Sequence, residues 1–279
     1  MEILSVKGLC KQYKSFALKN VSFKVQPGSI TGFIGRNGAG KTTTLKSLLN
    51  FVHPDAGEIR FFGRDFSENE MDIKQRIGFV SGGIHYYPQK KLRTIAAVTK
   101  RFYSGWDENA YRNYMADFGL DGQKTPRELS EGMKVKFSLA LALSHNAELL
   151  ILDEPTSGLD PVSRDELLDV FLSLAGEKKV GILFSTHITS DLEKCADHIV
   201  YLKNGVIIED GKTDSIQQKF RLVELKREQD AASFSDKLIG MKRNRDGFTA
   251  LVKAEDLPIP GLNPHPADLE SIMVHLEKE

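Results

Sequence analysis

The clearest chemical pattern in the sequence is a glycine-rich run at residues 35 to 42, Gly-Arg-Asn-Gly-Ala-Gly-Lys-Thr. It matches Gly, four residues, then Gly-Lys-Thr or Gly-Lys-Ser, where glycines turn the backbone tightly and aim successive N–H groups inward as an anion nest. In this pattern Lys41 reaches the β- and γ-phosphates of a nucleotide, and the Thr42 hydroxyl binds Mg²⁺. Average residue usage makes an accidental match roughly a one per cent event in a chain of this length, so we expect a nucleotide site.

Two acidic residues, Asp153 and Glu154, follow the apolar run Leu149-Leu150-Ile151-Leu152. If this run is a buried parallel strand, both carboxylates lie at the carboxyl edge of a sheet, where open α/β folds bind ligands. Asp153 then suits coordination of Mg²⁺, directly or through a water, and Glu154 suits polarisation of a water that attacks the γ-phosphate. Apolar runs that end in acids often mark only a strand meeting solvent. The glycine-rich run upstream favours the chemical interpretation.

The flanking residues predict the elements that position these groups. Apolar residues 30 to 34 predict a short buried strand, and the apolar residues between 45 and 52 recur at helical spacing. The loop therefore opens a helix whose N-terminus adds positive charge at the phosphates. Further strands are predicted at 2–7, 17–26, 58–62, 77–80, 149–154 and 180–187, with a hairpin turning at Asn204-Gly205. This alternation predicts an α/β fold with a mostly parallel sheet and an antiparallel β edge. With the glycine-rich loop, the predicted fold is a P-loop NTPase core.

Two further units are predicted around this core. Residues of about 83 to 147 are mostly helical in pattern, with Asp107 as a helix cap and a second helix after Ser130, so they form an inserted helical subdomain. The ATPase domain is predicted to span 1–211. Residues 212–279 form a small α+β C-terminal appendage, with a strand at 221–226, a helix near 231–240, a hairpin near 246–247, a proline-rich link at 258–266 and a last helix over 269–276. A stabilising role and a regulatory role for the appendage remain equally open.

Composition narrows the functional classes. Lys plus Arg and Asp plus Glu balance at 38 each, which gives no electrostatic argument for a nucleic-acid partner. Cys10 and Cys195 are far apart and without ligand-type neighbours, so we expect buried thiols in a reducing compartment. The N-terminal residues do not resemble a signal peptide, and the most apolar stretches are too short to span a bilayer. Any membrane role is therefore expected to come through a partner.

Three more sequence motifs lie downstream of the glycine-rich loop: Leu129-Ser130-Glu131-Gly132-Met133, Ser157-Gly158-Leu159-Asp160, and His187 at the end of a predicted strand. Together with the glycine-rich loop and the acidic strand end, their order and spacing closely resemble the ATP-binding subunit of an ABC transporter. The resemblance covers residues 1 to about 211. Within the family, the chain looks most like bacterial exporter ATPases of the bacitracin-resistance and peptide-export type.

The resemblance implies a role for each matching residue. ATP and Mg²⁺ are the implied cofactors, with Asp153 as the Mg²⁺-linked acid, Glu154 as the catalytic base and His187 as the switch residue at the γ-phosphate. Tyr13 would stack on adenine, whereas Ser130, Gly132 and Asp160 would meet a nucleotide across a dimer interface. The residues implied to hold the phosphates are Gly35, Arg36, Asn37, Gly38, Ala39, Gly40, Lys41, Thr42 and Thr43.

The sequence departs from the family pattern at two places. The usual signature Leu-Ser-Gly-Gly-Gln has Glu131 and Met133 here, and an acid near a phosphate is unfavourable unless it points away. After the strand at 77–80, Ser81-Gly82-Gly83 stand where the family has a glutamine, and Gln89 is too far along the chain. The apolar and aromatic residues 84–88 are expected to dock a helix of a membrane subunit. The alternative is that Tyr86 and Tyr87 pack the helical subdomain.

The leading hypothesis is an ATP-hydrolysing motor subunit of a membrane exporter, bound to the cytoplasmic face of the membrane through a transmembrane permease. It would dimerise with ATP, as a homodimer or with a sister ATPase. The alternative is a soluble ABC-type ATPase acting on ribosomes or DNA. A non-hydrolysing regulatory module is disfavoured because Lys41, Asp153, Glu154 and His187 are all present.

Overall fold

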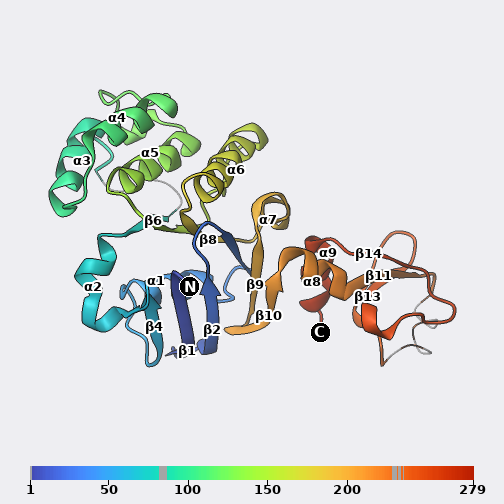
Figure 1. The fold of residues 1–279 in the computed structure, drawn as a ribbon. Helices are drawn as coiled ribbons and strands as arrows, with labels where there is room; N and C mark the ends of the chain where they lie inside the picture. The colour runs from blue at the N-terminus through green and yellow to red at the C-terminus, as the bar shows by residue number, and fades with distance from the viewer. Residues whose placement is uncertain (1, 82–86, 228–230, 232–233, 235) are drawn as a thin grey trace.

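The computed structural model describes residues 2–81, 87–227, 231, 234 and 236–279 (Figure 1). The core contains β1 (Leu4–Gln12), β2 (Ala17–Val25), β3 (Ile30–Ile34), α1 (Lys41–Leu48), β4 (Ala56–Phe61), β5 (Arg64–Asp65), α2 (Phe66–Lys74), β6 (Ile77–Ser81), β7 (Leu149–Asp153), α6 (Pro161–Gly176), β8 (Gly181–Thr186), α7 (Thr189–Cys195), β9 (His198–Lys203) and β10 (Val206–Lys212). The helical insert contains α3 (Leu92–Thr99), η1 (Lys100–Phe102), α4 (Glu108–Asp117), η2 (Pro126–Glu128) and α5 (Glu131–Ser144). The C-terminal part contains α8 (Thr213–Lys219), β11 (Phe220–Leu225), β12 (Ile239–Arg243), β13 (Phe248–Lys253), η4 (Ala254–Asp256), β14 (Pro264–Pro266) and α9 (Leu269–Leu276).

The central sheet positions the chemical residues. Its strand order within the described residues is β10-β9-β3-β8-β7-β6, parallel except for the antiparallel edge strand β10. All residues of β3, β7 and β8 are buried, as expected of parallel strands covered on both faces. Ile34 pairs with Thr186, and Asp153 with Ser185, so the carboxyl ends of these strands meet at one edge. The mostly parallel sheet with an antiparallel edge is confirmed.

An antiparallel sheet, β2-β1-β4-β5 within the described residues, packs against this core. Buried and exposed residues alternate from Asn20 to Val25 of β2, as expected of an antiparallel strand with one face on the core. β1 runs past the predicted end at residue 7, because register shifts after Val6 and Leu9 carry the strand past Gly8 to Gln12. Cys195 is a buried free thiol as expected, but Cys10 is only partly buried.

The helical insert lies above the sheets in Figure 1 and has its own hydrophobic cluster. The Asp107 side chain caps α4 by accepting from the Asn109 and Ala110 N–H groups, which confirms the predicted cap. The buried His145 side chain faces the Gln75 carbonyl at 3.1 Å and stacks on Tyr103, with ring centroids 3.7 Å apart. This contact joins the end of α5 to the end of α2.

The C-terminal part extends to the right in Figure 1 and contains the sheet β12-β13-β11-β14. The hairpin predicted near 246–247 joins β12 to β13. The helix predicted near 231–240 is wrong over its last residues, because Ile239 and Gly240 begin β12 and the Gly240 backbone packs on the His275 carbonyl of α9. The predicted last helix is α9, whose buried face shares a hydrophobic cluster with Leu192 and Tyr201 of the core.

Candidate active site

The glycine-rich loop connects the end of β3 at Ile34 to the start of α1 at Lys41. Two of its glycines are required by the packing. Gly40 has a φ of 110°, and a Cβ there would come within 2.6 Å of the Phe16 ring. A Cβ on Gly35 would collide with the carbonyl oxygen of Leu202 in β9. The loop is therefore clamped between β9 and the segment that precedes β2.

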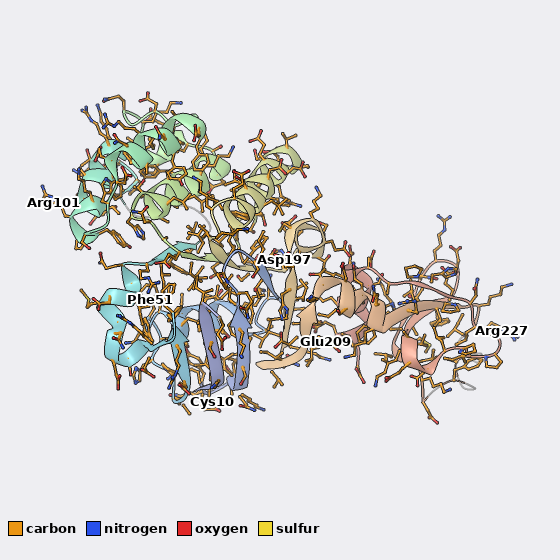
Figure 2. All side chains as sticks on the ribbon, viewed as in Figure 1. Cys10, Phe51, Arg101, Asp197, Glu209 and Arg227 are labelled. Atoms are coloured by element: carbon orange, nitrogen blue, oxygen red, sulfur yellow. The ribbon has the colours of Figure 1, made fainter. Side chains whose placement is uncertain are left out.

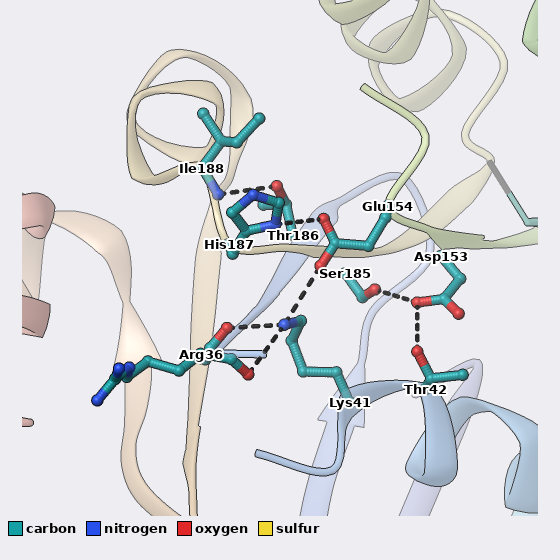
Figure 3. A network of polar contacts seen from close by, with 10 residues as sticks. Arg36, Lys41, Thr42, Asp153, Glu154, Ser185, Thr186, His187 and Ile188 are labelled. Atoms are coloured by element: carbon teal, nitrogen blue, oxygen red, sulfur yellow. Dashed lines mark hydrogen bonds and ion pairs between the residues drawn. The ribbon is translucent and has the colours of Figure 1, made fainter. Parts of the chain in front are cut away.

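Lys41 lies at the centre of a polar network and is buried (Figure 3). Its Nζ donates to the carbonyl oxygens of Gly35 at 2.7 Å and Arg36 at 3.4 Å. The same Nζ lies 3.2 Å from Oε1 of Glu154. The side chain thus lies against the glycine-rich loop and places its ammonium group beside the loop carbonyls and the Glu154 carboxylate.

Glu154 bridges Lys41 to His187. Its Oε2 lies 2.8 Å from Nδ1 of His187, which follows the end of β8. The Glu154 backbone has a φ of 51°, an uncommon conformation for a residue with a side chain. Its N–H donates to the Ser185 carbonyl at 2.9 Å, and its carbonyl accepts from the Ser157 N–H at 3.2 Å. Strain held in this way by its surroundings is typical of functional positions.

Asp153 is buried beside Thr42. Its Oδ1 accepts from the Ser185 hydroxyl at 2.6 Å and from the Thr42 hydroxyl at 3.3 Å. Carboxylate and hydroxyl oxygens are the hard ligands that Mg²⁺ prefers. Within the described residues there is no group of three or more His, Cys, Asp or Glu side chains that could hold a metal ion. The pair fits Mg²⁺, which usually takes one or two protein oxygens and completes its shell with phosphates and waters.

A cavity of about 740 Å³ lies over the glycine-rich loop. The residues that line it are Ser15, Phe16, Arg36, Asn37, Gly38, Gly40, Lys41, Thr42, Thr43, Glu154, Ser157, His187 and Asn204. The structure thus brings together most of the predicted phosphate-binding residues with Glu154 and His187. Sequence reasoning missed Ser15, Phe16 and Asn204 around the cavity, and Ser185 beneath it. The only signal for Ser185 was its place near the end of a predicted strand.

Tyr13 is not among the residues that line the cavity. Its ring is partly exposed and lies under Lys11, whose Nζ is 5.8 Å from the ring centroid. The Tyr13 N–H donates to the Phe16 carbonyl at 2.8 Å, so both aromatic residues belong to one tight turn. Within that turn, Phe16 is the aromatic residue that faces the cavity.

Ser130, Gly132 and Asp160 also lie outside the cavity lining. The Ser130 hydroxyl caps α5 by accepting from the Met133 N–H at 3.3 Å. The unexpected Glu131 is paired with Lys134 at 2.6 Å, so its charge is compensated locally. Asp160 caps α6 by accepting from the Val162 and Ser163 N–H groups, and hydrogen bonds from Ser163 and Val162 lower the pKa of its carboxyl.

The segment that replaces the family glutamine is only partly described. Ser81 ends β6 beside Asp153, and Gln89 lies in a turn. Residues 82–86, which include Tyr86 of the expected docking segment, lie outside the described residues. Tyr87 is described and is 60% exposed.

The fold and the site together define a class of protein. The glycine-rich loop follows β3 of a mostly parallel sheet, and Asp153 and Glu154 lie at the end of the nearby strand β7. This arrangement is that of a P-loop nucleoside triphosphatase.

Comparison with known proteins identifies the family. The sequence model of the ABC transporter family matches residues 18–157. The chain is 35% identical over 222 residues to the bacitracin transport ATP-binding protein BcrA of Bacillus licheniformis, covering 78% of this chain and 72% of that protein. The chain therefore belongs to the ABC transporter family.

A further relative and a solved structure support the same family. The Nod factor export ATP-binding protein I of Burkholderia orbicola (strain AU 1054) is 36% identical over 200 residues, which are 70% of this chain and 65% of that protein. A solved structure of the ATP-binding subunit of an ABC transporter superposes with a TM-score of 0.69 at 30% identity, over 77% of this chain and 92% of that one. The resemblance read from the motifs is confirmed: the chain is an ABC ATPase with a P-loop fold, and its relatives include a bacitracin transport and a Nod factor export ATP-binding protein.

Proposed function

We propose that this chain is the MgATP-hydrolysing motor of a membrane exporter and that it acts through a separate transmembrane subunit. The observation that carries the proposal is Glu154, which lies between Lys41 and His187 in a cavity lined by the glycine-rich loop. A carboxylate placed between a phosphate-binding cation and a strand-end histidine suits the activation of a water beside a γ-phosphate.

Each side chain of the cluster has a distinct task in this proposal. The Lys41 ammonium neutralises β- and γ-phosphate charge, and the backbone N–H groups at the start of α1 add their partial positive charge. Glu154 accepts a proton from the attacking water, while His187 orients Glu154 and the γ-phosphate. Thr42 and Asp153 would hold Mg²⁺, which neutralises charge on the phosphate oxygens when bound.

A second ATPase subunit completes the site in this proposal. Ser130, Gly132 and Asp160 are family motif residues, yet none of them lines the cavity of its own chain. Two subunits that face each other would bring these residues of one subunit to the nucleotide of the other. The expected species is a homodimer or a heterodimer with a sister ATPase, formed with MgATP.

Attachment to the membrane is assigned to the permease. No helix within the described ranges is long and apolar enough to cross a bilayer. Three large apolar residues lie on or near α2. Met71 is on the helix itself, Phe51 lies beside it with its ring centroid 5.5 Å from the Lys74 Nζ (Figure 2), and the backbone carbonyl of Phe102 accepts from the Gln75 side chain at the end of α2. These residues, here called the α2 patch, are 77% (Met71), 59% (Phe51) and 71% (Phe102) exposed, and we assign them to the contact with a cytoplasmic segment of the permease.

Glu154→Gln tests the proposal. The variant should bind MgATP with nearly wild-type affinity, because the amide keeps the size of the side chain, and hydrolyse it about 10²–10⁴-fold more slowly. The measurements are single-turnover hydrolysis and equilibrium binding of MgATP. Glu148→Gln at the other end of β7, where Glu148 pairs with Arg76 on the surface, is the control and should keep full turnover. Wild-type turnover in Glu154→Gln would remove Glu154 from the role of base.

A further inference from the structure

The end of the C-terminal helix α9 is fixed to the strand that supports the phosphate loop. The Tyr201 hydroxyl donates to Oε1 of Glu277 at 2.9 Å, and the Lys203 Nζ donates to the Leu276 carbonyl at 2.7 Å. Tyr201 and Lys203 both lie on β9, and Tyr201 pairs in register with Ile34, the last residue of β3. The final turn of α9 is thus held at the level where the glycine-rich loop begins.

The phosphate loop reaches back toward this helix end through one side chain. Nη1 of Arg36 lies 3.8 Å from Oε2 of Glu277. Figure 3 shows the Arg36 side chain directed away from Lys41 and Glu154, while its backbone carbonyl accepts from Lys41. Both carboxylate oxygens of Glu277 are therefore engaged, one by Tyr201 and one by Arg36, and the side chain is only 14% exposed.

Arg36 lies between the end of α9 and the cavity. Its guanidinium is beside the Glu277 carboxylate, and the residue itself is one of those that line the cavity assigned to the nucleotide. A guanidinium binds phosphate oxygens and carboxylates with similar geometry, so nucleotide phosphates in the cavity would compete with Glu277 for the same donors. The C-terminus of α9 strengthens the interaction of Arg36 with Glu277. Its carbonyl groups carry partial negative charge and favour nearby cations such as Arg36 and Lys203.

We propose that Glu277 is a positioning residue that holds the Arg36 guanidinium away from the nucleotide phosphates, so that the C-terminal helix sets the affinity of the phosphate loop for nucleotide. This inference rests on the proposed function, because its ligand is the phosphate chain of ATP or ADP. It gives the C-terminal part a regulatory role: any partner that displaces the end of α9 releases Arg36 and strengthens nucleotide binding.

The test is Glu277→Gln in the full-length chain, with MgADP as the probe in titration calorimetry and MgATP in steady-state hydrolysis. The amide still accepts the Tyr201 hydrogen bond but removes the charge that pairs with Arg36. We expect the Kd for MgADP and the KM for MgATP to fall about two- to fivefold, the range of an ion pair near the surface, because the Arg36 side chain is 69% exposed. The kcat should be unchanged. The gain should shrink at high salt because exposed charges are screened.

Two further variants separate positioning from a general charge effect. Glu270→Gln removes the same charge at the other end of α9, where Glu270 is exposed, and should leave the Kd unchanged. Arg36→Ala should abolish the gain, so Arg36→Ala with Glu277→Gln should bind MgADP like Arg36→Ala alone. Matching thermal unfolding midpoints would show that the variants are folded.

The outcomes distinguish the two levels of the proposal. If the wild-type chain binds MgADP and Glu277→Gln binds it equally well, the positioning role is wrong while the proposed function stands. The same conclusion follows if the gain persists without Arg36. If the folded wild-type chain binds neither MgADP nor MgATP, the proposed function is wrong and this inference falls with it.

Discussion

His187 contacts Glu154 at 2.8 Å and also lines the nucleotide cavity. We expect His187→Ala to retain MgATP binding and to lower kcat about 10²-fold, because a positioned donor at the developing charge is lost. Steady-state hydrolysis at saturating MgATP measures the effect. His198→Ala, which breaks a similar histidine–carboxylate contact with Asp210 away from the cavity, is the control. Equal rates in the two variants would contradict a role for His187 in hydrolysis.

The aromatic partner of the adenine is a second question at this scale. The resemblance assigns Tyr13, whereas Phe16 lines the cavity and packs on Gly40 of the loop. We expect Phe16→Ala to raise the Kd for ATP about tenfold, the loss of one aromatic contact, and Tyr13→Ala to have a smaller effect. Titration with ATP and with inorganic triphosphate would separate base from phosphate contacts. A larger loss of ATP affinity in Tyr13→Ala than in Phe16→Ala would show that Tyr13 is the residue that stacks on adenine.

The limits of sequence reasoning are visible at these residues. Lys41, Thr42, Asp153 and Glu154 were found because a local pattern identifies them and the strand order brings their strand ends together. Phe16 and Ser185 carry no local pattern, since their place beside the loop and beside Asp153 depends on how distant segments pack.

At the scale of elements, α2 was not predicted as a helix, although Asp65 caps it by accepting from the Ser67 N–H at 2.9 Å.

The α2 patch gives a direct test of the proposed permease contact through two of its exposed residues, Met71 and Phe102. Met71→Ser with Phe102→Ser should leave basal ATP hydrolysis unchanged and weaken co-purification with the co-expressed transmembrane subunit. Leu172→Ser on α6, also an exposed apolar residue, should have no effect on either. Full co-purification of the double variant would remove the α2 patch from the interface.

The contact between α5 and α2 should make the stability of the helical insert depend on pH. Burial lowers the pKa of His145 to about 4, against about 6.5 for an unperturbed histidine. The folded chain therefore favours the neutral ring, and the unfolded chain binds more protons between pH 6.5 and pH 4. Stability is then present above pH 6.5 and is lost as the pH falls through this window.

We expect this single group to lower the free energy of unfolding by about 2 kcal/mol between pH 7.5 and pH 5. Urea unfolding at the two pH values measures the difference. It should shrink in His145→Gln, which cannot titrate, and persist in His53→Gln at an exposed site. An unchanged pH dependence in His145→Gln would show that other groups control it.

At the scale of the whole molecule, the predicted ATPase domain at 1–211 and the C-terminal unit at 212–279 share a hydrophobic cluster, in which α9 packs on the core. That packing could not be predicted, because the amphipathic pattern of α9 identifies its buried face but not what covers it. The division at 211 is a prediction from sequence. The helix predicted near 231–240 failed at β12 because strand pairing with β13 outweighs a weak helical pattern.

Dimerisation is the prediction that involves two molecules. Gly132→Asp should prevent the MgATP-dependent dimer, best observed in the Glu154→Gln background, because it places a carboxylate where the partner's phosphates are expected. A side chain at Gly132 meets only ordinary contacts, the nearest being Ser163 at 3.5 Å, so the variant should fold. Gly176→Asp at the end of α6 is the matched control. A dimer that forms equally with Gly132→Asp in size-exclusion chromatography would contradict this interface.

The position of β3 between β8 and β9 has a consequence for how the chain folds during its synthesis on the ribosome. The Ile30 N–H donates to Asp197, 167 residues further along the chain, and the phosphate loop is closed by Gly205, whose N–H donates to the Ala39 carbonyl. Synthesis of that interval takes roughly ten to thirty seconds. β3 pairs with β8 and β9, so both of its edges stay unpaired until residues 181–186 of β8 have been synthesised, and one edge until β9 follows. We therefore expect nucleotide to stabilise the growing chain only after the hairpin of β9 and β10 has emerged. The sheet of β1, β2 and β4 has more local pairings and should form earlier.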